Sequence, residues 1–178
     1  GLQDTRTPLV VSVAGALANV LLNAIFIYGI NLGIAERFGE MGANVAVISR
    51  NEERIAVAAE RVKATGADAI GVVADVRDFD AVSRAFAATT EKWGEINVVI
   101  SGAAGNFLSP ATGLSANAFR TVVEIDLLGT FNVLRASFDH LRKPGASVIS
   151  ITAGQAKRPV MFQAHASAAK AGINNLTG

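Results

Sequence analysis

The chain has 178 residues, about half of them hydrophobic, and a formal net charge of only +1 at pH 7. This length fits a single domain, and a charge this close to zero gives no indication of a nucleic-acid partner. Because the chain has no cysteine and only two histidines, disulfides and cysteine-ligated metals are excluded, and we expect no metal site. The composition suits a reducing compartment, so we expect the main body of the chain to be cytoplasmic.

The N-terminal segment differs from the rest of the chain. Residues 7–35 contain no charged side chain and no histidine, and residues 9–30 are mostly Val, Ala, Leu, Ile and Phe. About 20 apolar residues suffice to span a bilayer, and Tyr28 stands where an interfacial aromatic residue would lie. The sequence therefore predicts an apolar, helix-like N-terminal segment and membrane association through residues 8–29.

Two stretches of this segment, GLQDTRTPL and ANVLLNAIFIYG, resemble a loop and a transmembrane helix of multidrug and toxin extrusion (MATE) transporters. The resemblance covers residues 1–29 and brings no transport site with it. Both ends of the chain look cut. We therefore interpret residues 1–29 as a transmembrane-like segment of foreign origin, joined to a domain over residues 30–178 that is truncated at its C-terminus.

From residue 30 onward, helical and strand patterns alternate. The patterns predict helices over 30–41, 52–65, 78–93, 115–140 and 162–176, and strands over 45–48, 69–74, 96–100 and 147–152. Asp78 and Ser115 stand as helix N-caps, and Gly42, Gly66 and Gly94 end elements. The alternation predicts an α/β fold with right-handed crossovers, a partial Rossmann-like, doubly wound parallel sheet in which residues 9–14 stand in for the first strand.

The strand over 96–100 reads as buried on both faces and runs into the loop Ser-Gly-Ala-Ala-Gly-Asn over residues 101–106. In an open parallel sheet, ligands lie beyond the carboxyl ends of the strands. Gly102 and Gly105 lack the Cβ atoms that would keep a ligand from the backbone. The loop is therefore predicted to form part of a binding crevice.

Several motifs occur in the order and spacing of the short-chain dehydrogenase/reductase family. They are GINLG at 29–33, SRN at 49–51, DV at 75–76, AAG at 103–105, DLLG at 126–129 and the helix that carries Lys170. Within that family, AAGNFLSP followed by IDLLGTFNV resembles the peroxisomal-type 2,4-dienoyl-CoA reductases. The resemblance covers residues 29–178 and implies an NADP(H) cofactor, an acyl-CoA thioester substrate and, in an intact chain, a homo-oligomer. The implied cofactor-binding residues are Gly29, Asn31, Ser49, Arg50, Asn51, Asp75, Val76, Ala103, Ala104, Gly105 and Lys170.

The chemistry of two of these positions can also be argued directly. A residue just beyond the second strand of such a sheet reaches the adenosine ribose, where the fork of Arg50 suits a 2′-phosphate and hence NADP(H). A solvated arginine at a strand end is the alternative. Asp75 resembles the family residue that contacts adenine, but a helix or turn cap is an equally good interpretation.

The phosphate-binding turn departs from the family pattern. Gly29 is kept, but Ile25 and Asn31 occupy the flanking glycine positions, and Phe-Ile-Tyr fills 26–28. Bulky side chains would fill the phosphate space, and β-branched residues resist positive φ. We therefore expect the chain as given to be an inactive fragment.

The catalytic motif also departs from the usual one. Most short-chain reductases pair Tyr with a Lys four residues later, but Ala166 stands four before Lys170, and Ala153 occupies the position of the upstream Ser. The resembled reductases lack that Tyr, and the resemblance implies that Asp126 and Lys170 are catalytic. NADPH would reduce the far end of a conjugated enoyl or dienoyl thioester, and a water held by Asp126 would return a proton to carbon. The alternatives are an Asp126 on a solvent-facing stripe and a surface Lys170.

Three further residues are candidates for substrate binding. Asn106 and Phe107 stand at the mouth of the crevice, and His165 neighbours the missing Tyr position. Phe107 as plain core, and His165 as a packing or solvent-facing residue, remain open, and Arg158 is a weaker candidate for the CoA phosphates. The function predicted from the sequence is thus an NADP-dependent enoyl- or dienoyl-CoA reductase. The alternative is a transporter fragment fused to a non-catalytic Rossmann remnant.

Overall fold

The computed structural model describes residues 26–178, with side chains from residue 32 onward. Almost all of the predicted transmembrane-like segment, residues 1–29, and the predicted first strand over 9–14 lie outside these described residues. No helix between residues 26 and 178 is both long and apolar enough to cross a bilayer.

Helices and strands alternate along the described chain, as predicted. The α-helices are α2 (Phe26–Glu40), α3 (Glu52–Lys63), α4 (Phe79–Trp93), α5 (Ala116–Val123), α6 (Gly129–Ser137) and α7 (Ala164–Leu176). The strands are β1 (Val45–Ser49), β2 (Ala69–Val73), β3 (Val98–Ser101) and β4 (Ser147–Ser150). A π-helix, η2 (Glu124–Leu128), joins α5 to α6, and short 3-10 turns lie at η1 (Ala111–Gly113), η3 (Phe138–His140) and η4 (Gly154–Ala156).

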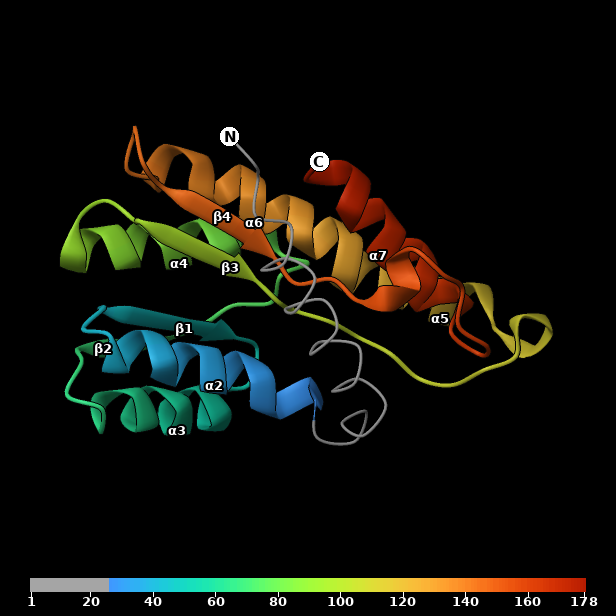
Figure 1. Cartoon of the computed structure of the whole chain (residues 1–178), viewed down its shortest axis with the longest axis horizontal. Coiled ribbons are helices and arrows are strands. Elements are labelled where there is room, and N and C mark those ends of the chain that lie inside the picture. The colour runs from blue at the N-terminus through green and yellow to red at the C-terminus, as the bar shows by residue number, and fades with distance from the viewer. Residues whose placement is uncertain (1–25) are drawn as a thin grey trace, which may run out of the picture.

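Two parallel strand pairs form the centre of the molecule. β1 pairs with β2 in the register Val45↔Ala69, and β3 pairs with β4 in the register Val98↔Ser147. Figure 1 shows β1 and β3 as the inner strands, facing each other between the two pairs. Within residues 26–178 no ladder joins β1 to β3, so the single continuous sheet that we predicted is present as two separate pairs. The strand predicted to join them falls on residues 9–14.

Local sequence accounts for most element boundaries. The side chains of Asn51, Asp78 and Ser115 each accept a hydrogen bond from the backbone N–H three residues later, which caps α3, α4 and α5. Gly94 ends α4 with a φ of 79°, a conformation that side chains with a Cβ rarely adopt. The predicted caps at Asp78 and Ser115 are confirmed.

The start of α2 differs from the prediction. The sequence predicted that this helix begins at residue 30, but α2 begins at Phe26, so Gly29 and Asn31 lie inside a helix. Phe26, Ile27 and Tyr28 favour this outcome because bulky L-residues fit the right-handed helical region better than the left-handed conformations of a glycine turn.

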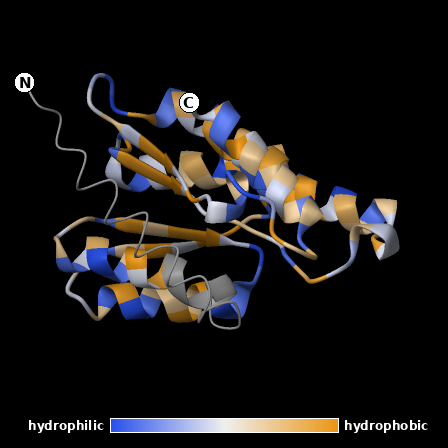
Figure 2. Cartoon of the chain, turned by 45° about the vertical axis from the view of Figure 1, so that its right-hand side comes forward, coloured by the Kyte–Doolittle hydropathy of each residue, from blue (hydrophilic) through white to orange (hydrophobic). Residues whose placement is uncertain are grey.

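Apolar packing ties the helices to the strands. Val82, Phe86, Val99 and Ala136 form a buried cluster between α4, β3 and α6, and the hydropathy colouring of Figure 2 shows β3 and β4 as largely apolar. The prediction that β3 is buried on both faces is wrong at Val98, whose side chain is 38% exposed. Since β3 pairs only with β4 within the described residues, one of its edges lacks a neighbouring strand there.

Candidate active site

The carboxyl ends of the strands lie on one side of the molecule. Figure 1 shows β1 and β3 running in the same direction, toward the end of the body where α5 and α7 lie. Because each pair is parallel, the residues that follow β1, β2, β3 and β4 are brought to this same edge. The candidate residues after the strands are therefore assembled at one end of the fold.

At the end of β1, Ser49 and the following Arg50 are exposed. The Oδ1 of Asn51 accepts a hydrogen bond from the backbone N–H of Arg54 at 2.8 Å, so this candidate side chain serves as the cap of α3. The Arg50 guanidinium lies near enough to Asp75 that its charge contributes to lowering the pKa of the Asp75 carboxyl. The loops after β1 and β2 thus approach each other at the edge of the sheet.

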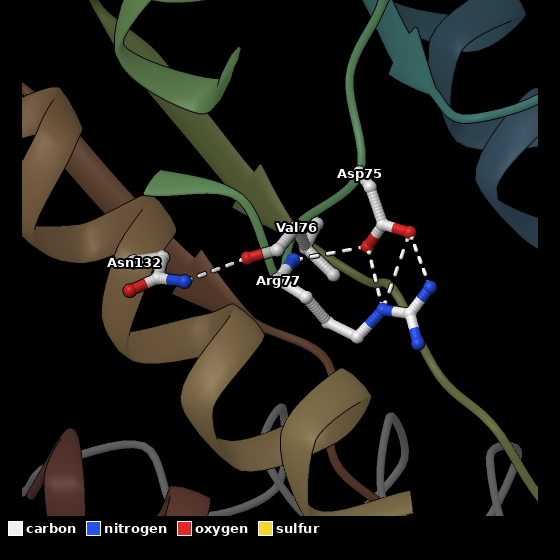
Figure 3. Close-up of polar contacts among 4 residues, drawn as sticks. All are labelled: Asp75, Val76, Arg77 and Asn132. Carbon is white, nitrogen blue, oxygen red and sulfur yellow. Dashed lines mark hydrogen bonds and ion pairs between the residues drawn. The ribbon is translucent and has the colours of Figure 1, made fainter. Parts of the chain in front are cut away.

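After β2, Asp75 forms an ion pair with Arg77, as Figure 3 shows. Nη2 of Arg77 lies 2.6 Å from Oδ2 of Asp75, and the hydrogen bond from this side chain is the main cause that holds the pKa of the Asp75 carboxyl below its ordinary range. The cap of α4 is Asp78, whereas Oδ1 of Asp75 accepts a hydrogen bond from the backbone N–H of Arg77 at 3.0 Å, so Asp75 caps a turn and not the helix. Its carboxylate is thus a paired, partly exposed anion at the rim of the site.

Two residues that sequence reasoning missed hold this loop in place. Asn132 on α6 donates a hydrogen bond from its Nδ2 to the carbonyl oxygen of Val76 at 2.8 Å. A Cβ built on Gly129 would lie 2.6 Å from Cγ2 of Val76, so only glycine allows α6 to approach Val76 this closely. The sequence offered a signal for Gly129, which is the glycine of the DLLG motif. It offered no signal for the role of Asn132, because the partner of this residue lies 56 positions away in the chain.

After β3, the loop over residues 102–110 contacts the π-helix η2 through Gly105. The backbone N–H of Gly105 donates a hydrogen bond to Oδ1 of Asp126 at 2.7 Å. Ala103 is half-buried and Ala104 is exposed, and a Cβ on Gly105 would approach Cδ1 of Ile125 to 3.2 Å. The predicted crevice loop is therefore fixed to the candidate catalytic aspartate through its backbone.

Asp126 and Lys170 form a buried ion pair. Oδ2 of Asp126 lies 3.4 Å from Nζ of Lys170, and their side chains are only 1% and 8% exposed. Lys170 also donates a hydrogen bond to the carbonyl oxygen of Ile151, at 3.2 Å. Burial raises the pKa of the Asp126 carboxyl, while the nearby Lys170 charge opposes that shift. A solvent-facing Asp126 and a surface Lys170, the alternatives left open by the sequence, are both excluded.

The π-helix explains how a residue in the middle of a helical stretch becomes buried. The sequence predicted one helix over 115–140, but the extra residue per turn in η2 breaks the α-helical register at Asp126. The Oγ1 of Thr130 donates to the backbone carbonyl of Asp126 at 2.7 Å. Such π-turns occur frequently at functional sites.

The three substrate candidates lie together where the loop after β3 meets the start of α7. The Nδ2 of Asn106 donates to Oε1 of Gln163 at 2.8 Å, and the rings of Phe107 and His165 stack with centroids 4.4 Å apart. His165 is fully buried and so does not face solvent, whereas Phe107 is 41% exposed and is not core. Arg158 is exposed in the turn after η4, and no described contact joins it to this group.

The family model described as short chain dehydrogenase matches residues 27–178. The chain belongs to the short-chain dehydrogenase family. It is 42% identical over 151 residues to the peroxisomal 2,4-dienoyl-CoA reductase of Rattus norvegicus, covering 84% of this chain and 52% of the rat protein. It is 36% identical over 158 residues to the corresponding Arabidopsis thaliana protein, covering 84% of this chain and 53% of that one. Among solved structures, a variant of actinorhodin polyketide ketoreductase with NADPH matches at a TM-score of 0.80 and 28% identity, over 84% of this chain and 58% of that one.

This short-chain dehydrogenase spans about half the length of these curated relatives. The comparisons give no support to the transporter resemblance of residues 1–29, which rests on sequence outside the described residues apart from the start of α2.

Proposed function

We propose that this short-chain dehydrogenase is an NADP-dependent reductase of conjugated enoyl- or dienoyl-CoA thioesters. The observation that carries the proposal is the buried pair of Asp126, in η2, and Lys170, on α7, at the carboxyl edge of the strands. Ala166 stands on α7 in place of the usual Tyr. The two curated relatives are named for production of a (3E)-enoyl-CoA by 2,4-dienoyl-CoA reduction, and this chain is identical to them at 42% and 36% of the aligned positions.

The residues at the strand ends fit a nicotinamide dinucleotide. Arg50 offers an exposed guanidinium beyond β1 for a 2′-phosphate, and Ser49 and Asn51 flank it. Asp75 and Val76 would meet the adenine end, Ala103, Ala104 and Gly105 would let the cofactor approach the backbone, and Lys170 would contact it from α7. Gly29 and Asn31, in α2, would lie nearest the phosphates. The cofactor, when bound, supplies the hydride.

The chain's own residues would manage charge and protons. As hydride reaches the far end of the diene, the electrons shift toward the thioester and its oxygen becomes negative. A water held by Asp126 gives a proton to the carbon next to the thioester, and the Asp126 carboxyl replaces the proton that this water loses. This step requires the protonated form of the Asp126 carboxyl. Because burial raises the pKa of this carboxyl, the protonated form persists to a higher pH than in an ordinary aspartate. Lys170 fixes the orientation of Asp126, and Asn106, Phe107 and His165 line the approach of the acyl thioester.

We also propose that this protein forms a homo-oligomer through the faces of α5 and α6. Phe119 on α5, Leu128 in η2, Phe131 on α6 and Phe138 in η3 are 40–59% exposed. Contiguous exposed apolar side chains are typical of protein interfaces. We place the reductase domain in the cytoplasm, whereas the two relatives are named as peroxisomal proteins.

The test is an assay of NADPH-dependent reduction of 2,4-hexadienoyl-CoA. The rate at which NADPH fluorescence is lost measures turnover. It uses a version of the chain in which residues 1–28 are replaced by the corresponding segment of the rat relative. Asp126→Ala should lower turnover by about 10²-fold and leave NADPH affinity nearly unchanged, since that is the usual scale for losing acid–base assistance. Glu124→Ala, in the same π-helix, is the matched control and should retain turnover. Undiminished turnover in Asp126→Ala would remove this residue from the mechanism.

A further inference from the structure

The His165 imidazole is buried without a hydrogen-bond partner. The residue is 0% exposed, and neither Nδ1 nor Nε2 has a partner among the described residues. Nearly all buried polar groups in folded proteins are hydrogen-bonded, and an unpaired buried donor or acceptor destabilises the folded state. A function that requires the imidazole would account for keeping such a group in this position.

Three contacts fix the ring in its place. The first is the stacking of the imidazole on Phe107. The other two connect the crevice loop to the start of α7: the hydrogen bond from Asn106 to Gln163, and one from the backbone N–H of Ser109 to the carbonyl oxygen of Phe162 at 2.9 Å. Phe162 has a φ of 62°, a conformation that costs energy for a bulky residue and recurs at functional sites. The start of α7 is therefore held against the crevice loop, and the orientation of the imidazole is set in advance.

The ring lies close to the proposed reaction centre. Its stacking partner, Phe107, lies two residues after Gly105, whose backbone N–H donates a hydrogen bond to Oδ1 of Asp126 at 2.7 Å. The Phe107 ring, which stacks on the imidazole, is 41% exposed, so the imidazole lies directly beneath a side chain that contacts solvent.

We propose that His165 is a catalytic residue, and that a ring N–H donates a hydrogen bond to the thioester carbonyl oxygen of the substrate once Phe107 is displaced by it. This inference rests on the proposed reductase function and assigns the oxygen-binding donor of that site. As hydride reaches the diene, negative charge develops on this oxygen. A fixed donor in a site shielded from water stabilises such charge more strongly than a donor in solvent does.

The experiment uses the chain in which residues 1–28 are replaced by the corresponding segment of the rat relative, and this version with His165 intact serves as the wild type. It separates packing from hydrogen bonding. His165→Phe keeps an aromatic ring against Phe107 and removes both nitrogens. His165→Asn and His165→Gln keep an amide donor near the positions of Nδ1 and Nε2. Calorimetry with 2,4-hexadienoyl-CoA, in the presence of NADP, measures thioester affinity. CoA itself is the control ligand, since it has no thioester carbonyl. Thermal unfolding measures stability.

We expect His165→Phe to raise Tm, because it replaces unpaired buried nitrogens by carbon, and to weaken hexadienoyl-CoA binding by about tenfold with CoA binding unchanged. One of the two amide variants should recover most of the affinity, which identifies the nitrogen that donates. If His165→Phe binds the thioester as tightly as the wild type, the imidazole acts in packing alone and the inference is wrong. The same holds if both amide variants fold but bind as weakly as the Phe variant.

These outcomes can be told apart from failure of the proposed function. A wild-type chain that binds no hexadienoyl-CoA refutes the reductase proposal and this inference together. A wild-type chain that binds the thioester, with an unaffected His165→Phe variant, refutes the inference and leaves the reductase proposal standing.

Discussion

Nζ of Lys170 lies 3.4 Å from Oδ2 of Asp126, and the same carboxylate accepts the backbone N–H of Gly105 at 2.7 Å on its other oxygen. One cation and one backbone donor thus face a carboxylate that is almost completely withdrawn from water. The cost of burial outweighs these favourable contacts, because the pKa of Asp126 is raised in spite of them. The Asp126 carboxyl therefore keeps its proton to a higher pH than an ordinary aspartate does, and its ionisation lowers the stability of the folded chain.

The pH dependence of stability should report this cost. The pKa of Asp126 in the folded chain is raised above its ordinary value of 3.8, so the folded state binds more protons at this site than the unfolded state does. The stability of the wild type relative to Asp126→Asn should therefore fall as pH rises from 3.8 through the raised pKa, and then level off. Denaturant unfolding of both proteins across this pH range measures the difference. A difference that grows with pH in favour of the wild type would contradict the raised pKa.

Removal of Lys170 should destabilise the fold far more than removal of an exposed lysine. Lys170→Met leaves the Asp126 carboxylate buried without its cation, and breaking a buried pair costs about 3–5 kcal/mol. Lys63→Met is the matched control, since Lys63 forms an exposed pair with Glu60 at 2.9 Å. Such surface pairs contribute about 0–1 kcal/mol. Equal losses of unfolding free energy in the two variants would show that the buried pair has no special energetic role.

Contacts between residues close together in the sequence were predictable, whereas contacts between distant residues were not. Caps such as Asp78 and Ser115 were predictable because their partners lie three residues away. The π-helix around Asp126 was not, since the same apolar residues would also suit an α-helix and periodicity alone does not show one extra residue. The contacts from Asn106 to Gln163 and from Asn132 to Val76 join residues 57 and 56 positions apart. Local patterns carry no information about such pairs, so the site's supporting contacts appeared only in the folded chain.

Gly129→Ala should test the close contact between α6 and the loop after β2. The added Cβ would lie 2.6 Å from Cγ2 of Val76, and overpacking of this kind typically costs about 1–3 kcal/mol. Gly33→Ala, in α2, meets no atom within 4 Å and should stabilise the helix by about 1 kcal/mol. The double variant Gly129→Ala with Val76→Ala should recover part of the loss, because the two side chains meet directly. Chemical denaturation of the wild type, Gly129→Ala, Val76→Ala, the double variant and Gly33→Ala decides the matter, and additive effects of the pair would refute the contact.

The last prediction concerns the inner edges of the two strand pairs. β1 pairs only with β2 and β3 only with β4 within residues 26–178, so each presents one row of backbone groups without a neighbouring strand there. A strand that paired with both edges would supply ladder hydrogen bonds on two sides and cover apolar side chains such as Val98. Replacement of residues 1–28 by a β-strand and a glycine-rich turn should therefore raise Tm and allow NADPH to bind.

Calorimetry and thermal unfolding of the full and replaced chains measure both effects. The matched control is the same replacement with proline at the centre of the new strand, where the missing N–H interrupts the ladder. We expect roughly micromolar NADPH affinity, the ordinary range for a metabolic cofactor site, in the replaced chain, and much weaker binding in the full chain and the proline control. The reason is that the phosphates need both a paired strand and a turn that admits positive φ. A soluble monomer of the full chain that bound NADPH as tightly as the replaced chain would show that residues 1–28 already provide what the strand edges require.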